Sequence, residues 1–125
     1  MRILSITAQK PHSTGSGVYL TETVRGFKEL GHTQAVIAGV TREDSVKLPE
    51  GVGFYPVYYN SPELPFPVCG MSDEMPYEST RYRYMKPDMV DKFEAAFGST
   101  VLRAVKEFRP DVVICHHLYL LAAIV

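Results

Sequence analysis

Two glycines and a serine, Gly15, Ser16 and Gly17, stand near the start of the chain in a setting typical of phosphate binding. An apolar, β-rich run at residues 2–8 precedes them, and residues 18–30 follow with the apolar period of a helix. A strand that leads into a helix through a turn of small residues presents unpaired backbone N–H groups to an anion. The turn therefore predicts a small-molecule site at which backbone amides approach a phosphate group.

Two adjacent histidines, His116 and His117, follow an apolar run at residues 111–115. A single histidine beside a buried strand is more often a hydrogen-bonded structural residue. A pair at the carboxyl end of a strand, facing a glycine-containing loop, is better placed to bind a ligand. We predict His116 as the functional residue and His117 as its neighbour in the site.

Cationic and aromatic side chains alternate at Arg81, Tyr82, Arg83 and Tyr84. Such side chains stack on sugar rings and pair with anions, so Arg81 and Tyr82 are predicted to hold an anionic or sugar acceptor. An ordinary solvated loop explains the same pattern equally well.

Cys115 directly precedes the two histidines, and Cys69 is the other cysteine of the chain. Adjacent ligands at one strand end do not match the usual separations of zinc ligands. We therefore predict no metal site and no cofactor.

The elements that position these residues follow from local patterns. Residues 18–30 repeat apolar side chains every three or four positions and are expected to pack one face on a sheet, made of Leu20, Val24, Phe27 and Leu30. Ser16 is the expected N-cap and Gly31 the stop. Residues 33–38 and 53–59 predict two more strands, the second at an edge because Pro56 removes a ladder donor.

The second half of the chain begins with a long irregular segment at residues 60–86, whose aromatic residues favour an ordered loop. A long amphipathic helix then runs from Pro87 to Phe108, and residues 111–115 predict a parallel strand buried on both faces. We expect an α/β fold with a Rossmann-like parallel sheet and flanking helices. The loops after the first and last strands would then meet at one rim of the sheet, which brings the glycine turn and the histidine pair into one cleft.

Composition limits the classes of function. The chain has 125 residues, 46% of them apolar, and a net charge of -1, so it has no basic field of the kind that binds nucleic acid. Two distant cysteines predict a reducing compartment, and no apolar segment has the length of a signal peptide core or a membrane span. We expect a cytoplasmic protein. The apolar run at residues 118–125 indicates part of a longer protein.

Three stretches together resemble a known family: the start MRIL, the Gly-Ser-Gly turn with a helix ending in Leu30-Gly31-His32, and RPDVVICHH at residues 109–117. They are similar to the N-terminal domain of retaining glycosyltransferases of GT-B architecture, the large group that includes sucrose-phosphate synthase and bacterial mannosyltransferases. The resemblance implies that residues 1–125 form the acceptor-side Rossmann-like domain of an enzyme that transfers a sugar from a nucleotide-diphosphate donor to an acceptor alcohol. It implies a C-terminal donor domain outside these residues.

The resemblance also implies roles for individual residues. Gly15, Ser16 and Gly17 would approach the donor diphosphate, and His116 would contact the donor sugar near the reaction centre, with His117 beside it. Many relatives carry a further histidine where this chain has Ile114, and many have adjacent glycines in the turn, so the chain departs from the pattern at both places.

Two alternatives stay open. A nicotinamide-dinucleotide-binding Rossmann domain of an oxidoreductase has the same fold. However, the third glycine of that fingerprint would fall at Leu20, and no acidic residue stands at the end of the second strand at Ala38-Gly39. A non-catalytic α/β module would use the tyrosine-rich loop to bind a protein partner.

Overall fold

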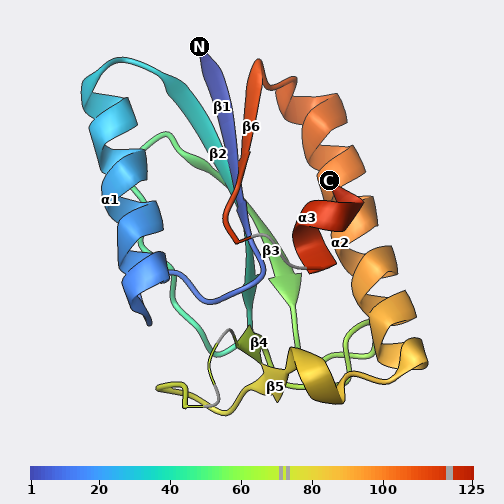
Figure 1. Cartoon of the computed structure of the whole chain (residues 1–125). Helices are drawn as coiled ribbons and strands as arrows, with labels where there is room; N and C mark the ends of the chain where they lie inside the picture. The colour runs from blue at the N-terminus through green and yellow to red at the C-terminus, as the bar shows by residue number, and fades with distance from the viewer. Residues whose placement is uncertain (71, 73, 118–119) are drawn as a thin grey trace.

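Four parallel strands form the centre of the molecule. The computed structural model describes residues 1–70, 72, 74–117 and 120–125. Its main sheet has the order β3-β2-β1-β6, with β1 at Arg2–Thr7, β2 at Thr33–Val40, β3 at Gly53–Tyr58 and β6 at Val112–Cys115. Helix α1 (Gly15–Glu29) covers one face and helix α2 (Pro87–Phe108) the other, which makes three layers (Figure 1). The chain is an α/β protein, as predicted, and its sheet order is that of one half of a Rossmann-like fold.

Helix α1 begins earlier than predicted, because the glycine turn is itself helical. Thr14, rather than Ser16, is the N-cap: its side chain accepts a hydrogen bond from the Gly17 N–H. Leu20 and Val24 are buried against β2 as expected. The prediction for Leu30 is wrong, because this residue is the C-cap and is 73% exposed.

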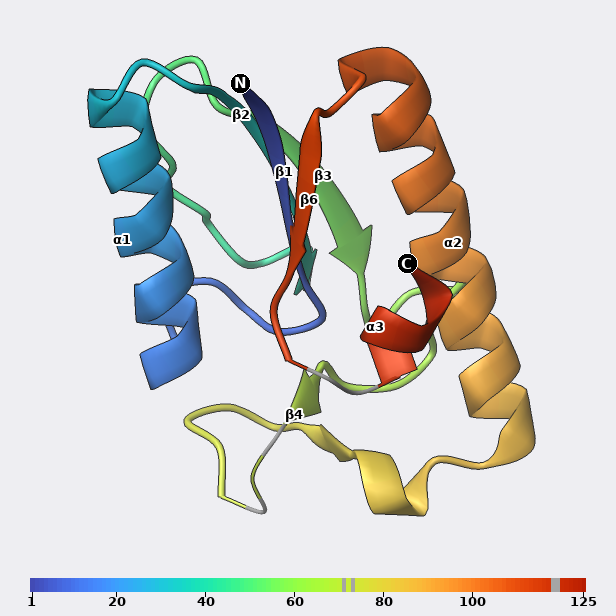
Figure 2. The same ribbon diagram turned by 45° about the horizontal axis from the view of Figure 1, so that its top comes forward.

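Helix α2 has the predicted bounds. Pro87 stands at its start, where a missing N–H costs nothing, and Arg109 ends it in the left-handed conformation with φ of 53°. Its buried aromatic residues, Phe93, Phe97 and Phe108, pack on the sheet. Val105 continues the apolar period of the helix but is 41% exposed. The short helix α3 (Leu120–Ile124) packs against α2 (Figure 2).

One edge of the sheet is as predicted and the other is not. Strand β3 lies at an edge, as Pro56 predicts. Strand β6 was predicted to be buried on both faces, but it forms the other edge, and Val112 and Val113 are 38% and 40% exposed. An apolar strand is buried on both faces only where neighbouring elements cover them, and among the described strands β6 pairs with β1 alone.

The segment between β3 and α2 is ordered and adds to the core. It contains the two short parallel strands β4 (Cys69–Gly70) and β5 (Thr80–Arg81) and a 3-10 helix at Tyr82–Tyr84. Buried apolar side chains from it, such as Leu64 and Phe66, join the main core cluster. Figures 1 and 2 show that this segment lies across the end of the sheet at which the strands terminate. Within the described part of the chain, no helix has both the length and the apolar character needed to cross a bilayer.

Candidate functional site at the carboxyl ends of the strands

The two predicted site segments meet at one rim of the sheet. Ile6 of β1 is in register with Cys115 of β6, and the N–H of His116 donates to the carbonyl of Ile6 at 2.9 Å. On the other side, the His116 ring lies edge-on to Tyr19 of α1, with 6.1 Å between ring centroids. The start of α1 and the histidine pair therefore lie together at the carboxyl ends of β1 and β6. In a sheet of this order the chain winds outward in both directions from that point, and open α/β sheets typically bind their ligands in a crevice there.

The two glycines at the start of α1 differ in their surroundings: the backbone packs closely on Gly17 but not on Gly15. A Cβ atom on Gly17 would lie 2.8 Å from the Lys10 carbonyl oxygen and 2.9 Å from the His12 nitrogen, so only glycine lets the preceding loop pack on the helix. Nothing lies within 4 Å of the equivalent position on Gly15. Because Thr14 caps the Gly17 N–H, the first two N–H groups of the helix, on Gly15 and Ser16, are the ones left without an intrahelical partner.

A polar side chain that the sequence analysis missed lies directly beneath the helix start. Gln9 follows β1 and is only 2% exposed. The Ser16 hydroxyl donates to its Oε1 at 3.3 Å, and the Thr14 and Ser16 hydroxyl oxygens lie 3.0 Å apart. The Gln9 Nε2 is buried and has no hydrogen-bond partner among the described residues. The position of Gln9 in the sequence could have identified it, because a polar residue soon after a buried strand lies at the rim of the sheet.

A second missed group ties three loops together. The Lys10 ammonium lies 3.0 Å from the Asp44 carboxylate, which also accepts hydrogen bonds from the N–H and hydroxyl of Thr41. Lys10 also stacks over the ring of Tyr77 at 4.8 Å. Burial raises the pKa of Asp44, but the Thr41 and Lys10 contacts outweigh it, and the net pKa is lowered. Asp44 therefore remains ionised and fixes the loop after β1 to the loop after β2.

Two buried polar atoms at this rim have no hydrogen-bond partner within the part of the chain that the structure describes: Gln9 Nε2 and His116 Nε2. Nearly all buried polar atoms in proteins are paired, so an unpaired group calls for an explanation, such as a bound ligand or water. The two belong to different segments, one that follows β1 and one that follows β6. They give this rim polar groups that a ligand can satisfy.

The histidines are held in a neutral state. Burial lowers the pKa of His116, and the neighbouring His117 lowers it further. Burial also lowers the pKa of His117, whose backbone is left-handed with φ of 73°. At neutral pH the free Nε2 of His116 is therefore a hydrogen-bonding atom and carries no positive charge.

The predicted acceptor residues lie on the neighbouring segment. Arg81 is in β5, with its guanidinium carbon 5.9 Å from the Tyr84 ring. Tyr82 is half-buried against the main core, and burial, with Cys69 as the next cause, raises the pKa of its hydroxyl well above the ordinary value. It is therefore a packed residue and not part of an ordinary solvated loop.

The predicted end of the second strand is wrong, because β2 continues past Ala38-Gly39 to Val40. The first acidic residue after β2 that is not exposed is Asp44, and it pairs with Lys10. Leu20, at the third fingerprint position, is buried between α1 and β2 together with Val24, where a glycine would allow closer packing of helix and strand.

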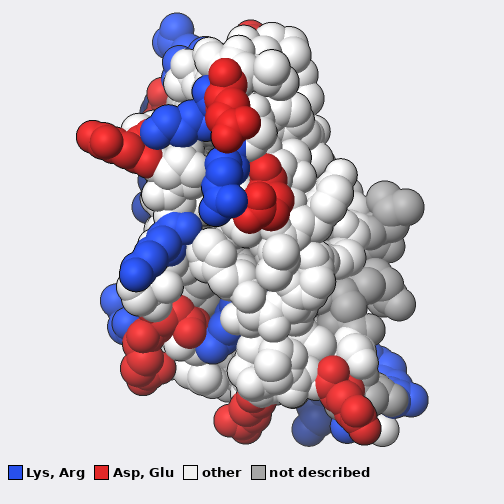
Figure 3. Space-filling model, turned by 90° about the vertical axis from the view of Figure 1, so that its left-hand side faces the viewer, with Lys and Arg blue, Asp and Glu red and all other residues white. Residues whose placement is uncertain are grey.

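Charge does not gather on the α1 side of the molecule. Figure 3 shows basic and acidic side chains interleaved there, with a broad uncharged area beside them. One such pair, Arg25 with Glu22, is an exposed ion pair at 2.9 Å. Among the described residues, no three histidine, cysteine or acidic side chains lie together in a way that could hold a metal ion. No protein-family model matches the sequence, and no curated protein matches it significantly.

Proposed function

We propose that this chain is the N-terminal, acceptor-side domain of a retaining glycosyltransferase of GT-B architecture, which transfers a sugar from a nucleotide-diphosphate donor to an acceptor alcohol. One observation carries the proposal: buried polar atoms on Gln9 and His116, which have no partner among the described residues, lie at the rim where α1 begins with two N–H groups that have no partner within the helix. A ligand with both a diphosphate and hydroxyl groups satisfies both kinds of group.

The start of α1 supplies the contact to the diphosphate. The N–H groups of Gly15 and Ser16 lie at the positive end of the helix dipole, and the open space at Gly15 leaves room for a phosphate oxygen. Negative charge grows on the departing diphosphate in the transition state, so fixed N–H groups stabilise that state more than the bound donor. In the proposed enzyme, Gly17 keeps the loop packed and does not itself contact the diphosphate, because its N–H is used by Thr14.

His116 supplies a contact to the sugar. Its backbone is fixed by the carbonyl of Ile6 and its ring by Tyr19, so the Nε2 has a defined position. A neutral imidazole there can accept a hydrogen bond from, or donate one to, a sugar hydroxyl and orient the ring for transfer. His117 adjoins the donor, and Arg81 and Tyr82 are assigned to the acceptor. A cytoplasmic site of action is part of the proposal, because Cys69 and Cys115 are both free thiols.

The test is a transfer assay on the protein that joins this domain to a donor domain, with uridine, guanosine and adenosine diphosphate sugars offered in turn. We expect H116A to lower kcat about 100-fold at saturating donor, the usual effect of losing one hydrogen-bonding group to the reacting centre. H32A is the control, because the His32 ring packs on Phe27 at the opposite end of α1. Circular dichroism and a melting curve show whether each variant is folded. Near-normal turnover by folded H116A would contradict the assigned role.

The same panel separates the alternatives. Preferential binding of NAD or NADP over every nucleotide sugar would replace the transferase with an oxidoreductase. Binding of no nucleotide at all by the two-domain protein would favour the interaction module.

A further inference from the structure

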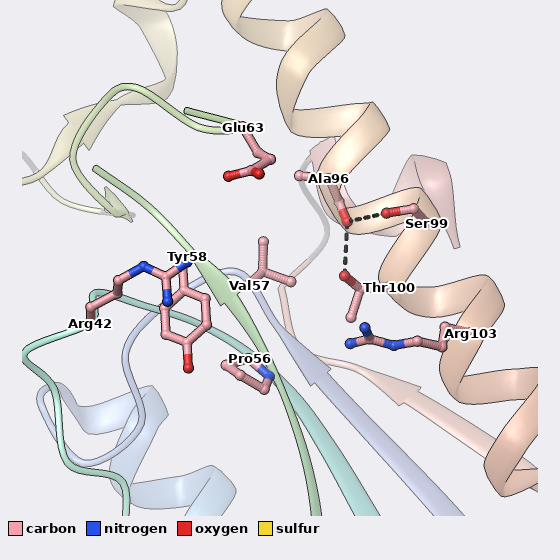
Figure 4. Close-up of a pocket in the computed structure, with 9 residues that line it drawn as sticks. All are labelled: Arg42, Pro56, Val57, Tyr58, Glu63, Ala96, Ser99, Thr100 and Arg103. Carbon is pink, nitrogen blue, oxygen red and sulfur yellow. Dashed lines mark hydrogen bonds between the residues drawn. The ribbon is translucent and has the colours of Figure 1, made fainter. Parts of the chain in front are cut away.

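A hollow lies away from the rim where α1 begins, between the edge strand β3, helix α2 and the loop after β2. Its volume is about 370 Å³, within the range of small-molecule sites. Pro56 and Val57 line it with apolar groups, and three charged side chains surround them: Arg42, Glu63 and Arg103 (Figure 4). None of these five residues belongs to the crevice between β1 and β6.

The two arginines are positioned by aromatic rings and not by carboxylates of the described residues. The guanidinium carbon of Arg42 lies 4.4 Å from the Tyr58 ring centroid, and that of Arg103 lies 5.6 Å from the Tyr55 ring. Stacking on an aromatic face fixes a guanidinium while its N–H groups remain available in its own plane. Neither arginine forms an ion pair with a carboxylate of the described residues. The hollow therefore has two oriented cations without an anionic partner among the residues that the structure describes.

Figure 4 shows how these charges are arranged. Arg42 and Arg103 extend from opposite sides, from the loop after β2 and from α2, while the Glu63 carboxylate approaches from a third side. The hydroxyls of Ser99 and Thr100 on α2 both donate to the Ala96 carbonyl, so their oxygen lone pairs face outward as acceptors only. The lining carries two positive charges against one negative charge.

We propose that this hollow binds a small phosphate ester of a polyhydroxy compound, with the size of a hexose phosphate. Two guanidinium groups on opposite sides match the three terminal oxygens of a phosphoryl group better than the two oxygens of a carboxylate, which lie in one plane. Glu63 accepts hydrogen bonds from the hydroxyl groups, and the apolar face of the sugar packs on Pro56 and Val57. The inference does not depend on the transferase proposal, since it uses none of the crevice residues.

The test is calorimetric titration of the chain with glucose 6-phosphate, with glucose and inorganic phosphate as separate probes. We expect millimolar or tighter binding of the ester, weaker binding of inorganic phosphate, and no heat with glucose. R42Q and R103Q should each weaken binding of the ester by about tenfold or more, as expected for the loss of a charged hydrogen bond. R25Q is the matched control, because Arg25 is an exposed arginine on α1 that pairs with Glu22.

Two further measurements make the outcome specific. E63Q should weaken binding of glucose 6-phosphate but leave that of inorganic phosphate unchanged, because Glu63 is assigned to the hydroxyl groups. Uridine diphosphate should not compete with the ester, which separates this site from the crevice. Absence of ester binding up to about 10 mM, or equal loss of affinity in R25Q and R42Q, would overturn the proposal, whatever the result of the transfer assay.

Discussion

Replacing Gly17 with alanine tests whether the loop after β1 is packed on the start of α1 as the structure shows. The new Cβ atom would lie 2.8 Å from the Lys10 carbonyl oxygen, 2.9 Å from the His12 nitrogen and 3.3 Å from the Pro11 carbonyl carbon. All three are backbone atoms, so no side chain can rotate away and the loop itself must shift. Forcing an extra carbon into a packed site costs about 1–3 kcal/mol.

The matched control is G15A, two residues earlier in the same helical turn. Nothing lies within 4 Å of the Cβ position on Gly15, so this variant has the helix-forming gain of alanine, at most about 0.5–1 kcal/mol, without the clash. The difference between the two variants isolates the packing cost. For a domain of 125 residues, 1 kcal/mol corresponds to about 4 °C in Tm.

We therefore expect G17A to melt about 4–12 °C below G15A, measured by thermal circular dichroism and checked by urea unfolding. The urea slope should be the same for both variants, because the surface exposed on unfolding does not change. Equal melting temperatures for the two variants would refute the close approach of the loop, and with it the geometry assigned to the start of α1.

Three other predictions follow from single contacts. D44N should lower the free energy of unfolding at pH 7 by about 1–3 kcal/mol. This loss should vanish as the pH falls through the lowered pKa of Asp44, because a carboxyl group with a depressed pKa stabilises the fold only while it is ionised. Urea unfolding between pH 3 and 7 measures it, and a loss that is constant over that range would speak against the Lys10 ion pair. G39A should lower the free energy of unfolding by about 3 kcal/mol, because its Cβ would lie 2.3 Å from the Ala8 carbonyl oxygen. The control G26A should be neutral or stabilising, because its Cβ meets nothing within 4 Å. Similar unfolding curves for the two variants would contradict this prediction. The His116 ring should titrate below the ordinary 6.5 in a proton NMR series, and a value at or above 6.5 would show that the ring is solvated.

The sequence predicts the order and type of the main elements well, because their signals are local. The period of the buried phenylalanines defines α2, and the flanking Pro87 and Arg109-Pro110 define its ends. Pro56 correctly places β3 at an edge. These features depend on the backbone and on neighbours within a few residues.

Most of the errors concern packing between distant segments, whereas the N-cap of α1 is a local error. An apolar run such as β6 is equally consistent with a central strand or an edge strand, and only the sheet order decides. Leu30 continues the apolar period of α1 but lies beyond the last turn that touches the sheet. The N-cap was assigned to Ser16 because a Gly-Ser-Gly sequence is typical of a loop, whereas Thr14 two residues earlier supplies the cap.

The candidate site was predicted in part. The meeting of the α1 start with His116 follows from parallel strand topology alone, and the structure shows the contact through Tyr19. The contributions of Gln9, Asp44 and Tyr77 depend on how three loops fold over the rim, and no motif marks them. Their positions after β1, after β2 and before α2 become informative only once the sheet order is known.

The central claim is that the start of α1 and the imidazole of His116 line one ligand-binding crevice. The most direct measurement is NMR titration of the isotope-labelled chain with uridine, guanosine and adenosine diphosphates, following the backbone amides and the histidine ring signals. We predict weak, saturable shifts for at least one nucleotide, with the Gly15 and Ser16 amides and the His116 ring moving together. Shifts confined to other parts of the surface, or movement of the helix amides without His116, would contradict the claim.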